Sequence, residues 1–162
     1  SDPSIDAPEA AERRIALGET IRQLGNAENE SWGIEHGFRY ENSAIIIDDH
    51  LETNFDPMRC DGRLLSGGRL PHVFLADGRA IFDLLGPAFT LLIIGEMPTD
   101  DFEVAARGIP VEIVRLEREA VLEPWPWRPI LVRPDQHISW HGEEAPADWS
   151  AIIDIATGRI AA

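Results

Sequence analysis

The sequence predicts an α/β domain built on a mixed central sheet. Three observations predict it: an almost wholly apolar stretch at 89–94, a helical pattern followed by a second strand pattern at 99–116, and a hairpin pattern at 130–140. Strands joined through a helix pair in parallel, whereas the two strands of a hairpin are antiparallel. The sheet therefore contains both kinds of pair, and helices cover its faces.

Local patterns place the individual elements of this domain, residues 61–162. Phe89–Ile94 has Thr90 as its single polar residue, which is typical of a central strand buried on both faces. Thr99 is suited to cap a helix that Gly108 ends. In chain order we expect a strand at 73–75, an Asp77-Gly78 turn, a return strand at 80–82, the central strand, a helix at 99–107, a strand at 111–116, hairpin strands at 130–133 and 137–140, and a helix at 146–155.

Residues 1–60 are expected to form a helical adaptor ahead of that domain. A helix is predicted over 7–36, because Ala10, Leu17, Ile21 and Leu24 form one apolar stripe at helical spacing. The Gly25-Asn26 pair interrupts the pattern and leaves open one long helix or two. The stripe has few partners within the chain, so we expect this helix to dock on another domain.

The adaptor continues into a short strand and a loop. The run Ile45–Ile47 predicts a buried strand, since three β-branched residues follow one another. Residues 50–68 are polar and contain Asp56-Pro57 and Gly67-Gly68, which predicts a connecting loop. The boundary between the two parts is therefore placed within this loop.

The charge of the chain excludes two classes of partner. The formal net charge of the 162 residues is -15, from 29 acidic and 14 basic side chains. Such a chain has no basic surplus with which to neutralise nucleic-acid phosphates or an anionic membrane surface. No apolar run approaches the roughly 20 residues that a membrane-spanning helix needs, and no signal peptide is expected at the N-terminus.

The cysteine and lysine content of the chain indicates its cellular location and its source. Cys60 is the single cysteine, which rules out an intramolecular disulfide and a cysteine-rich zinc site. A reducing, cytoplasmic location is the simplest interpretation. All 14 basic residues are Arg, which we interpret as the compositional bias of a GC-rich bacterial source.

Three separated motifs carry a family resemblance. The first contains Arg69, Pro71, His72, Asp77, Gly78, Asp83 and Gly86; the second contains Arg133, Pro134, Asp135 and Trp140; the third is the stretch Gly37–Ser43. The first two resemble the C-terminal thioredoxin-like domain of FAD-dependent aromatic-ring hydroxylases, the phenol hydroxylase and polyketide hydroxylase relatives. The third, which precedes them in the chain, resembles the short stretch that follows the last helix of the flavin domain in those enzymes. The resemblance covers the chain from about Arg13 to Gly158.

The resemblance implies a thioredoxin-like three-layer sandwich that serves as a structural or interaction domain. In the full-length enzyme it implies FAD and NAD(P)H as cofactors, an N-terminal FAD-binding domain of the same enzyme as partner, and a homo-oligomer as one option. The G-x-G-x-x-G fingerprint that holds the FAD pyrophosphate is absent from this sequence. No residue here is therefore expected to be catalytic, to bind a cofactor or to ligate a metal.

The segment where a thioredoxin-like domain keeps its redox cysteines holds none. It reads Gly95-Glu96-Met97-Pro98-Thr99-Asp100, and its acidic residues would raise the pKa of a thiol rather than lower it. Thiol–disulfide exchange is thus excluded, and Cys60 is interpreted as an incidental loop thiol. The alternative function is a stand-alone, redox-dead binding module; a peroxiredoxin-like or transferase enzyme is disfavoured for want of a nucleophile.

Some residues have a structural and a functional interpretation. His72 is favoured as structural rather than as a base, and Arg69 is expected to pair with a carboxylate. Pro129 is a candidate cis-proline, because thioredoxin-like folds often carry one before that strand. His137 and His141 are disfavoured as a metal pair, since residues four apart on a strand lie about 13 Å apart.

The Trp125-Pro126-Trp127 loop is left open between an interface with a partner and a loop packed over the core.

Overall fold

The computed structural model describes residues 7–25, 30–125 and 129–160 of the 162-residue chain. Its centre is a four-stranded sheet in the order β2-β1-β3-β4. The strands are β1 (Phe89–Ile94), β2 (Val111–Leu116), β3 (Pro129–Val132) and β4 (Ile138–His141). β1 pairs with β2 in parallel and with β3 antiparallel, and β3 pairs antiparallel with β4. The predicted α/β class with a mixed sheet is confirmed.

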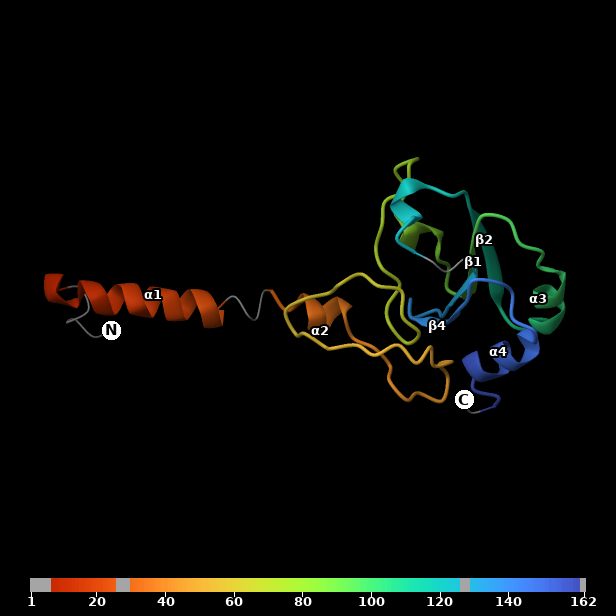
Figure 1. The fold of residues 1–162 in the computed structure, drawn as a ribbon, viewed down its shortest axis with the longest axis horizontal. Helices are drawn as coiled ribbons and strands as arrows, with labels where there is room; N and C mark the ends of the chain where they lie inside the picture. The colour runs from red at the N-terminus through yellow and green to blue at the C-terminus, as the bar shows by residue number, and fades with distance from the viewer. Residues whose placement is uncertain (1–6, 26–29, 126–128, 161–162) are drawn as a thin grey trace.

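One face of the sheet is covered by two helices (Figure 1). These are α3 (Asp100–Ala105) and α4 (Trp149–Ala156). Along β1 alternate side chains point to opposite faces, and Leu91 and Ile93 pack on this side against Phe102 of α3 and Ile153 of α4. The Asp148 carboxylate caps α4 by accepting the N–H groups of its first turn at 2.8 and 3.2 Å.

The other face is covered by loops and 3₁₀ turns. Leu92 and Ile94 of β1 pack there with Leu70, Leu75 and Ile81. The two 3₁₀ turns of this layer are η3 (Ile81–Leu84) and η4 (Ala120–Leu122). Three layers therefore exist, but α-helices form one of the outer two.

Two strand predictions are wrong. Residues 45–47 form a turn in which Ile46 is buried and the Ile47 N–H donates to the Ser139 carbonyl at 2.9 Å. The segments 73–75 and 80–82 share a single bridge, and η3 replaces the return strand. The reason is local, because the Asp83 carboxylate accepts the Ala80 N–H at 3.0 Å and favours a 3₁₀ turn.

The predicted N-terminal helix is divided. A 3₁₀ turn η2 (Pro8–Ala10) leads into α1 (Ala11–Gly25), and α2 (Trp32–His36) follows after residues that lie outside the described part. No residue of α1 is buried, and α1 lies apart from the sheet in Figure 1. The apolar side chains of α1 are exposed by 44–72%: Ile15, Leu17, Ile21 and Leu24.

Within the described residues, no helix is long and apolar enough to cross a membrane.

Candidate functional site

A buried ionic network joins the N-terminal segment to the end of the sheet. The Asp49 carboxylate accepts hydrogen bonds from the Arg39 guanidinium at 2.5 Å and from the His141 ring at 3.0 Å. It also accepts the backbone N–H groups of Leu51 at 3.0 Å and Ser66 at 2.6 Å. The side chains of Arg39, Asp49 and His141 are 11%, 8% and 2% exposed. These three residues with Ser66 are called the Asp49 network below.

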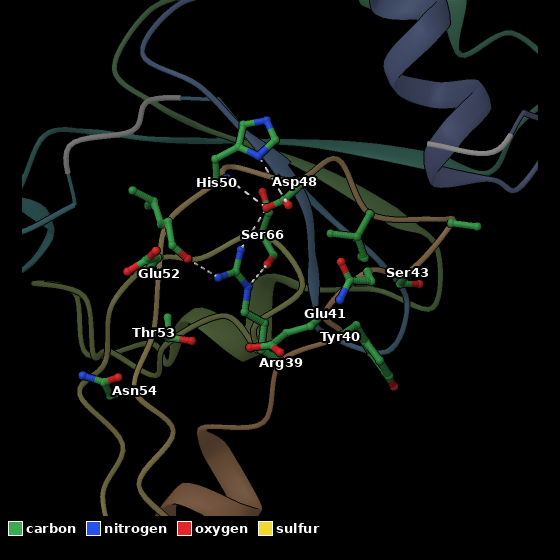
Figure 2. Close-up of a pocket in the computed structure, with 14 residues that line it drawn as sticks. Arg39, Tyr40, Glu41, Ser43, Asp48, His50, Glu52, Thr53, Asn54 and Ser66 are labelled. Carbon is green, nitrogen blue, oxygen red and sulfur yellow. Dashed lines mark hydrogen bonds and ion pairs between the residues drawn. The ribbon is translucent and has the colours of Figure 1, made fainter.

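The network fastens a strap, residues 39–50, across β4. Arg39 also donates to the Ser66 carbonyl at 2.7 Å and to the Leu51 carbonyl at 2.6 Å, and Figure 2 shows its guanidinium beside Ser66. Further along the strap, the Ser139 hydroxyl of β4 donates to the Ile45 carbonyl at 3.0 Å. Backbone groups that would otherwise be buried without partners are thereby satisfied.

The environment sets the protonation of the two titratable members. Burial alone would raise the pKa of Asp49, but the hydrogen bonds from Ser66, Leu51 and His141, together with the Arg39 charge, outweigh it and hold the pKa below its usual value. Burial lowers the pKa of His141 below 6.5 despite the neighbouring carboxylate. At neutral pH the pair is therefore a neutral imidazole that donates its Nε2–H to an ionised carboxylate.

A histidine held by a carboxylate is also the pattern of a general base and its orienting group. Here the His141 side chain is 2% exposed, which leaves no room for a substrate at its ring. The neighbouring hydroxyl, Ser139, already donates to a backbone carbonyl. The arrangement therefore suits fastening of the strap rather than acid–base catalysis.

An open cavity of about 770 Å³ lies beside the network, between the strap and the loop that follows it (Figure 2). Carboxylates Glu41, Asp48 and Glu52 line it, whereas the Arg39 guanidinium is engaged with Asp49, with two carbonyl groups and, at 3.5 Å, with Asp48 itself. A flavin pyrophosphate is held by backbone N–H groups and cations, and these carboxylates would repel it. The cavity does not fit FAD.

The first sequence motif forms a half-buried contact centre around Arg69. Its guanidinium lies 2.9 Å from the His36 ring, donates to the Gln136 side chain at 2.7 Å, and lies 4.8 Å from the centre of the Phe82 ring. The prediction that Arg69 pairs with a carboxylate is wrong, because the guanidinium contacts the Gln136 amide oxygen and the rings of His36 and Phe82 instead. His72 stacks on Phe82 with ring centres 5.4 Å apart.

The other residues of that motif shape its turns. Gly78 has φ of 86° and follows Asp77, whose carboxylate accepts the Arg79 N–H at 3.0 Å. The side-chain and backbone hydrogen bonds of Arg79 lower the pKa of Asp77. Pro71 is half-buried at the start of the segment, and Gly86 lies so close to Glu112 that a Cβ would meet its carboxylate at 2.8 Å. The Asp77-Gly78 turn is thus where the sequence predicts it.

The second motif ties the β3–β4 hairpin to α4. Arg133 donates to the Asp135 carboxylate at 3.3 Å and to the Ala156 carbonyl at 3.2 Å, at the end of α4. Pro134 lies in the turn between the strands, and Trp140 packs edge to face on Trp149 with ring centres 5.2 Å apart. Each of these contacts is structural.

The remaining candidates lie apart from one another. Cys60 is an exposed free thiol in the loop. The His137 ring lies 4.6 Å from the Tyr40 ring, whereas His141 belongs to the Asp49 network. Trp125 is 9% exposed and packs in the core, which favours the core interpretation of its loop; Trp127 lies outside the described residues.

The peptide bond that precedes Pro129 involves residue 128, which also lies outside the described residues, so its cis geometry stays a prediction. In the described part of the chain no three side chains of His, Cys, Asp or Glu gather in a group that suits a metal ion.

Sequence reasoning missed the Asp49 network. Its members Asp49 and His141 are 92 residues apart, and neither stands in a motif with recognisable spacing. Arg39 in the third motif was the available signal, because a cation flanked by Phe38 and Tyr40 is suited to a half-buried position.

Comparison with known proteins identifies the family. The sequence model described as "Aromatic-ring hydroxylase, C-terminal" matches residues 63–159. The chain belongs to this family. The match spans the whole sheet and the helices α3 and α4, and it leaves all of residues 1–60 outside it.

The relatives of this chain are much longer proteins. The FAD-dependent monooxygenase opdD of Penicillium oxalicum is 36% identical over 86% of this chain, which spans 29% of its length. Phenol 2-monooxygenase of a Pseudomonas species is 32% identical over 94% of this chain and 29% of its own length. Among solved structures, RebC with bound 7-carboxy-K252c superposes with a TM-score of 0.79 and 29% identity, over 96% of this chain and 31% of that one. Relatives thus occur in fungi and bacteria, and the bacterial source stays a prediction.

Proposed function

We propose that this chain is the C-terminal part of an FAD-dependent aromatic monooxygenase and serves there as a redox-inactive, thioredoxin-like structural domain. The observation that carries the proposal is the family match over residues 63–159, in a chain that spans 29% of its monooxygenase relatives. Oxidoreductase chemistry then belongs to the whole enzyme, and the docking of its domains belongs to this part.

The loop at the position of a redox site supports the inactive assignment. Arg115 of β2 donates to the Met97 carbonyl at 2.9 Å and to the Thr99 hydroxyl at 3.1 Å. The loop from Gly95 to Thr99 is therefore held by a guanidinium and carries no thiol. Arg115 therefore stabilises this loop, and the loop contains no group that could accept electrons.

FAD and NAD(P)H are assigned to the remainder of the enzyme. When bound, the flavin takes two electrons from NAD(P)H and supplies them for insertion of one oxygen atom of O₂ into an aromatic ring, the other leaving as water. The acidic cavity beside the strap does not suit the flavin pyrophosphate. No step of the flavin chemistry is assigned to residues of this chain.

In this proposal the residues of this chain fasten its own segments together and present apolar surface to the rest of the enzyme. The Asp49 network fastens the strap to β4, and Arg133 fastens the hairpin to α4. The exposed stripe of α1 is suited to burial against the flavin-binding part, since isolated apolar helix faces are costly in water. Homo-oligomer contacts remain a second use for the same stripe.

The test is flavin binding by two proteins purified in parallel. The product of the full reading frame is expected to carry FAD and to oxidise NAD(P)H faster when an aromatic substrate is added. The 162-residue chain is expected to carry no flavin absorbance. Stoichiometric flavin on this chain alone, or a full-length product that binds none, would overturn the proposal.

A stand-alone binding module is the second candidate. The lack of a dinucleotide fingerprint within these 162 residues fits this candidate and the first one equally. The two candidates differ in the gene itself, because the first requires an upstream G-x-G-x-x-G segment in the same reading frame.

A further inference from the structure

Six side chains, five of them aromatic rings and one an arginine, form a continuous series of contacts that begins on α2. Trp32 of α2 stacks on His36 with ring centres 5.3 Å apart, and His36 lies 2.9 Å from the Arg69 guanidinium. Arg69 lies over Phe82, Phe82 stacks on His72, and His72 packs edge to face on Phe74 at 4.8 Å. This series is called the ring ladder: Trp32, His36, Arg69, Phe82, His72 and Phe74.

Both ends of the ring ladder are exposed. Trp32 is 57% and Phe74 is 65% exposed, and Ile34 beside the first is 58% exposed. Aromatic side chains and arginine are the residue types that carry most binding energy at protein interfaces. The ends of the ring ladder are not buried in the core. A connected aromatic surface of this kind indicates a place where another protein surface binds.

The ring ladder is held rigidly in place. Gly33 of α2 donates its N–H to the Pro57 carbonyl at 3.1 Å, and a Cβ at this position would lie 1.7 Å from the Asp56 carbonyl oxygen. Only glycine allows this close approach of α2 to the loop. In the middle of the ladder, the Gln136 side chain fixes Arg69. A rigid surface loses less conformational entropy when it binds.

The position of the ring ladder favours one occupant. It begins on α2, next in the chain to α1, and in Figure 1 both helices lie on the side of the domain away from α3 and α4. This chain spans 29% of the length of its monooxygenase relatives, so each of them is more than three times as long as the part that matches. We propose that the ring ladder is the surface on which the flavin-binding part of the same polypeptide docks, an inference that rests on the proposed function.

Hydroxyl-radical footprinting of the full-length enzyme and of the 162-residue chain tests the proposal. Trp32 and Phe74 are expected to lose most of their reactivity in the full-length enzyme, by fivefold or more as an order of magnitude for burial in an interface. Val104 is the internal control, because it is 62% exposed and belongs to α3, which lies away from α2 in Figure 1. Its reactivity is expected to be equal in the two proteins.

Substitutions in the full-length enzyme give a second measurement that does not require the short chain to fold. Phe74→Asp and Trp32→Asp are expected to split thermal unfolding into two transitions, because the two parts lose their contact. Val104→Asp is the matched control and is expected to leave a single transition. A single transition in all three variants would overturn the proposal.

The outcomes separate the surface from the function. Full reactivity of Trp32 and Phe74 in an enzyme that carries FAD would refute the docking surface and leave the proposed function standing. Protection that disappears on dilution would assign the surface to a second copy of the chain and also overturn the proposal. A full-length product without flavin would instead refute the proposed function itself.

Discussion

At the scale of single residues, the Asp49 network shows how buried charges are retained. A buried carboxylate is tolerated when cations and N–H groups surround it, and Asp49 has both in Arg39, His141 and two backbone amides. Removing the carboxylate would leave the buried Arg39 guanidinium to the more exposed Asp48 carboxylate, which lies 3.5 Å from it. The network should therefore contribute far more to stability than the exposed ion pairs of the same chain.

Asp49→Ala is expected to lower the free energy of unfolding by about 3–5 kcal/mol, the range for breaking a buried ion pair. Asp61→Ala is the matched control, because Asp61 also pairs with a neighbouring arginine but is 56% exposed. It is expected to change stability by no more than about 0.5 kcal/mol. Urea unfolding measures both, and equal losses in the two variants would contradict the account.

Acid should weaken the fold through His141. Its pKa in the folded chain lies below the unfolded value of 6.5, so below pH 6.5 the unfolded chain binds more protons than the folded one. Stability then falls with decreasing pH, at up to about 1.4 kcal/mol per unit, until His141 itself protonates. Asp49 adds a further loss below its unfolded value of 3.8, since its pKa is also lowered.

The free energy of unfolding measured between pH 7 and pH 5 checks this. His141→Gln should show a shallower dependence on pH than the parent chain, whatever its own stability. Parallel slopes for the two proteins would mean that His141 does not titrate as its burial implies.

At the residue scale the sequence predicted roles better than partners. Arg69 and Arg133 were singled out as structural, and each makes fixed contacts. Apart from Asp135, which belongs to the same motif as Arg133, their partners Gln136, His36 and Ala156 lie 23 to 67 positions away in the chain. Such pairs depend on how the sheet folds, and no local pattern encodes them.

At the scale of elements, the strap illustrates a connection that backbone geometry controls. Gly67 has φ of 82°, and a Cβ there would lie 2.7 Å from the Tyr40 carbonyl oxygen of the strap. Its N–H donates to the Ile138 carbonyl of β4 at 2.7 Å. Glycine at this position therefore lets the strap lie against the sheet edge.

Gly67→Ala should destabilise the chain more than Gly62→Ala. Both positions have positive φ, which costs any other residue about 1–2 kcal/mol, but a Cβ at Gly62 meets open space. Overpacking against the strap is expected to add about 1–3 kcal/mol at Gly67. Chemical denaturation compares the two, and a Gly62 variant as unstable as the Gly67 variant would disprove the close approach.

α1 should be weakly protected when the chain is studied alone. It has 15 residues and none of them is buried, and helices of about 12–15 residues are marginal in water without tertiary packing. Hydrogen exchange is expected to be fast over 11–25 and slow over β1. Slow exchange in α1 of a monomeric chain would contradict this expectation, because it would show that α1 packs against another segment of the same chain.

The strands of the sheet could be predicted to within one residue, because apolar runs and a Pro-Asp turn delimit them. The actual conformations of segments 45–47 and 73–82, which are turns and a single bridge rather than strands, could not be predicted. Their β-branched and aromatic residues have strand propensity, but their N–H groups bond to Ser139 across the sheet edge and within local turns. Tertiary hydrogen bonds override a weak local preference.

At the scale of the whole molecule, the described residues combine a well-covered sheet with exposed apolar surface. Helices pack on one face of the sheet and 3₁₀ turns on the other. The α1 stripe and both ends of the ring ladder remain exposed, and α1 and α2, on which the ladder begins, lie away from α3 and α4 in Figure 1. A domain with this distribution of apolar surface is suited to a place within a larger enzyme.

The measurement that tests the central claim most directly is the flavin content of the full-length gene product compared with that of this chain. The account predicts one FAD per full-length polypeptide, NAD(P)H oxidation that an aromatic substrate accelerates, and no flavin on residues 1–162 alone. A full-length product that lacks flavin, or a 162-residue chain that binds it stoichiometrically, would contradict the account.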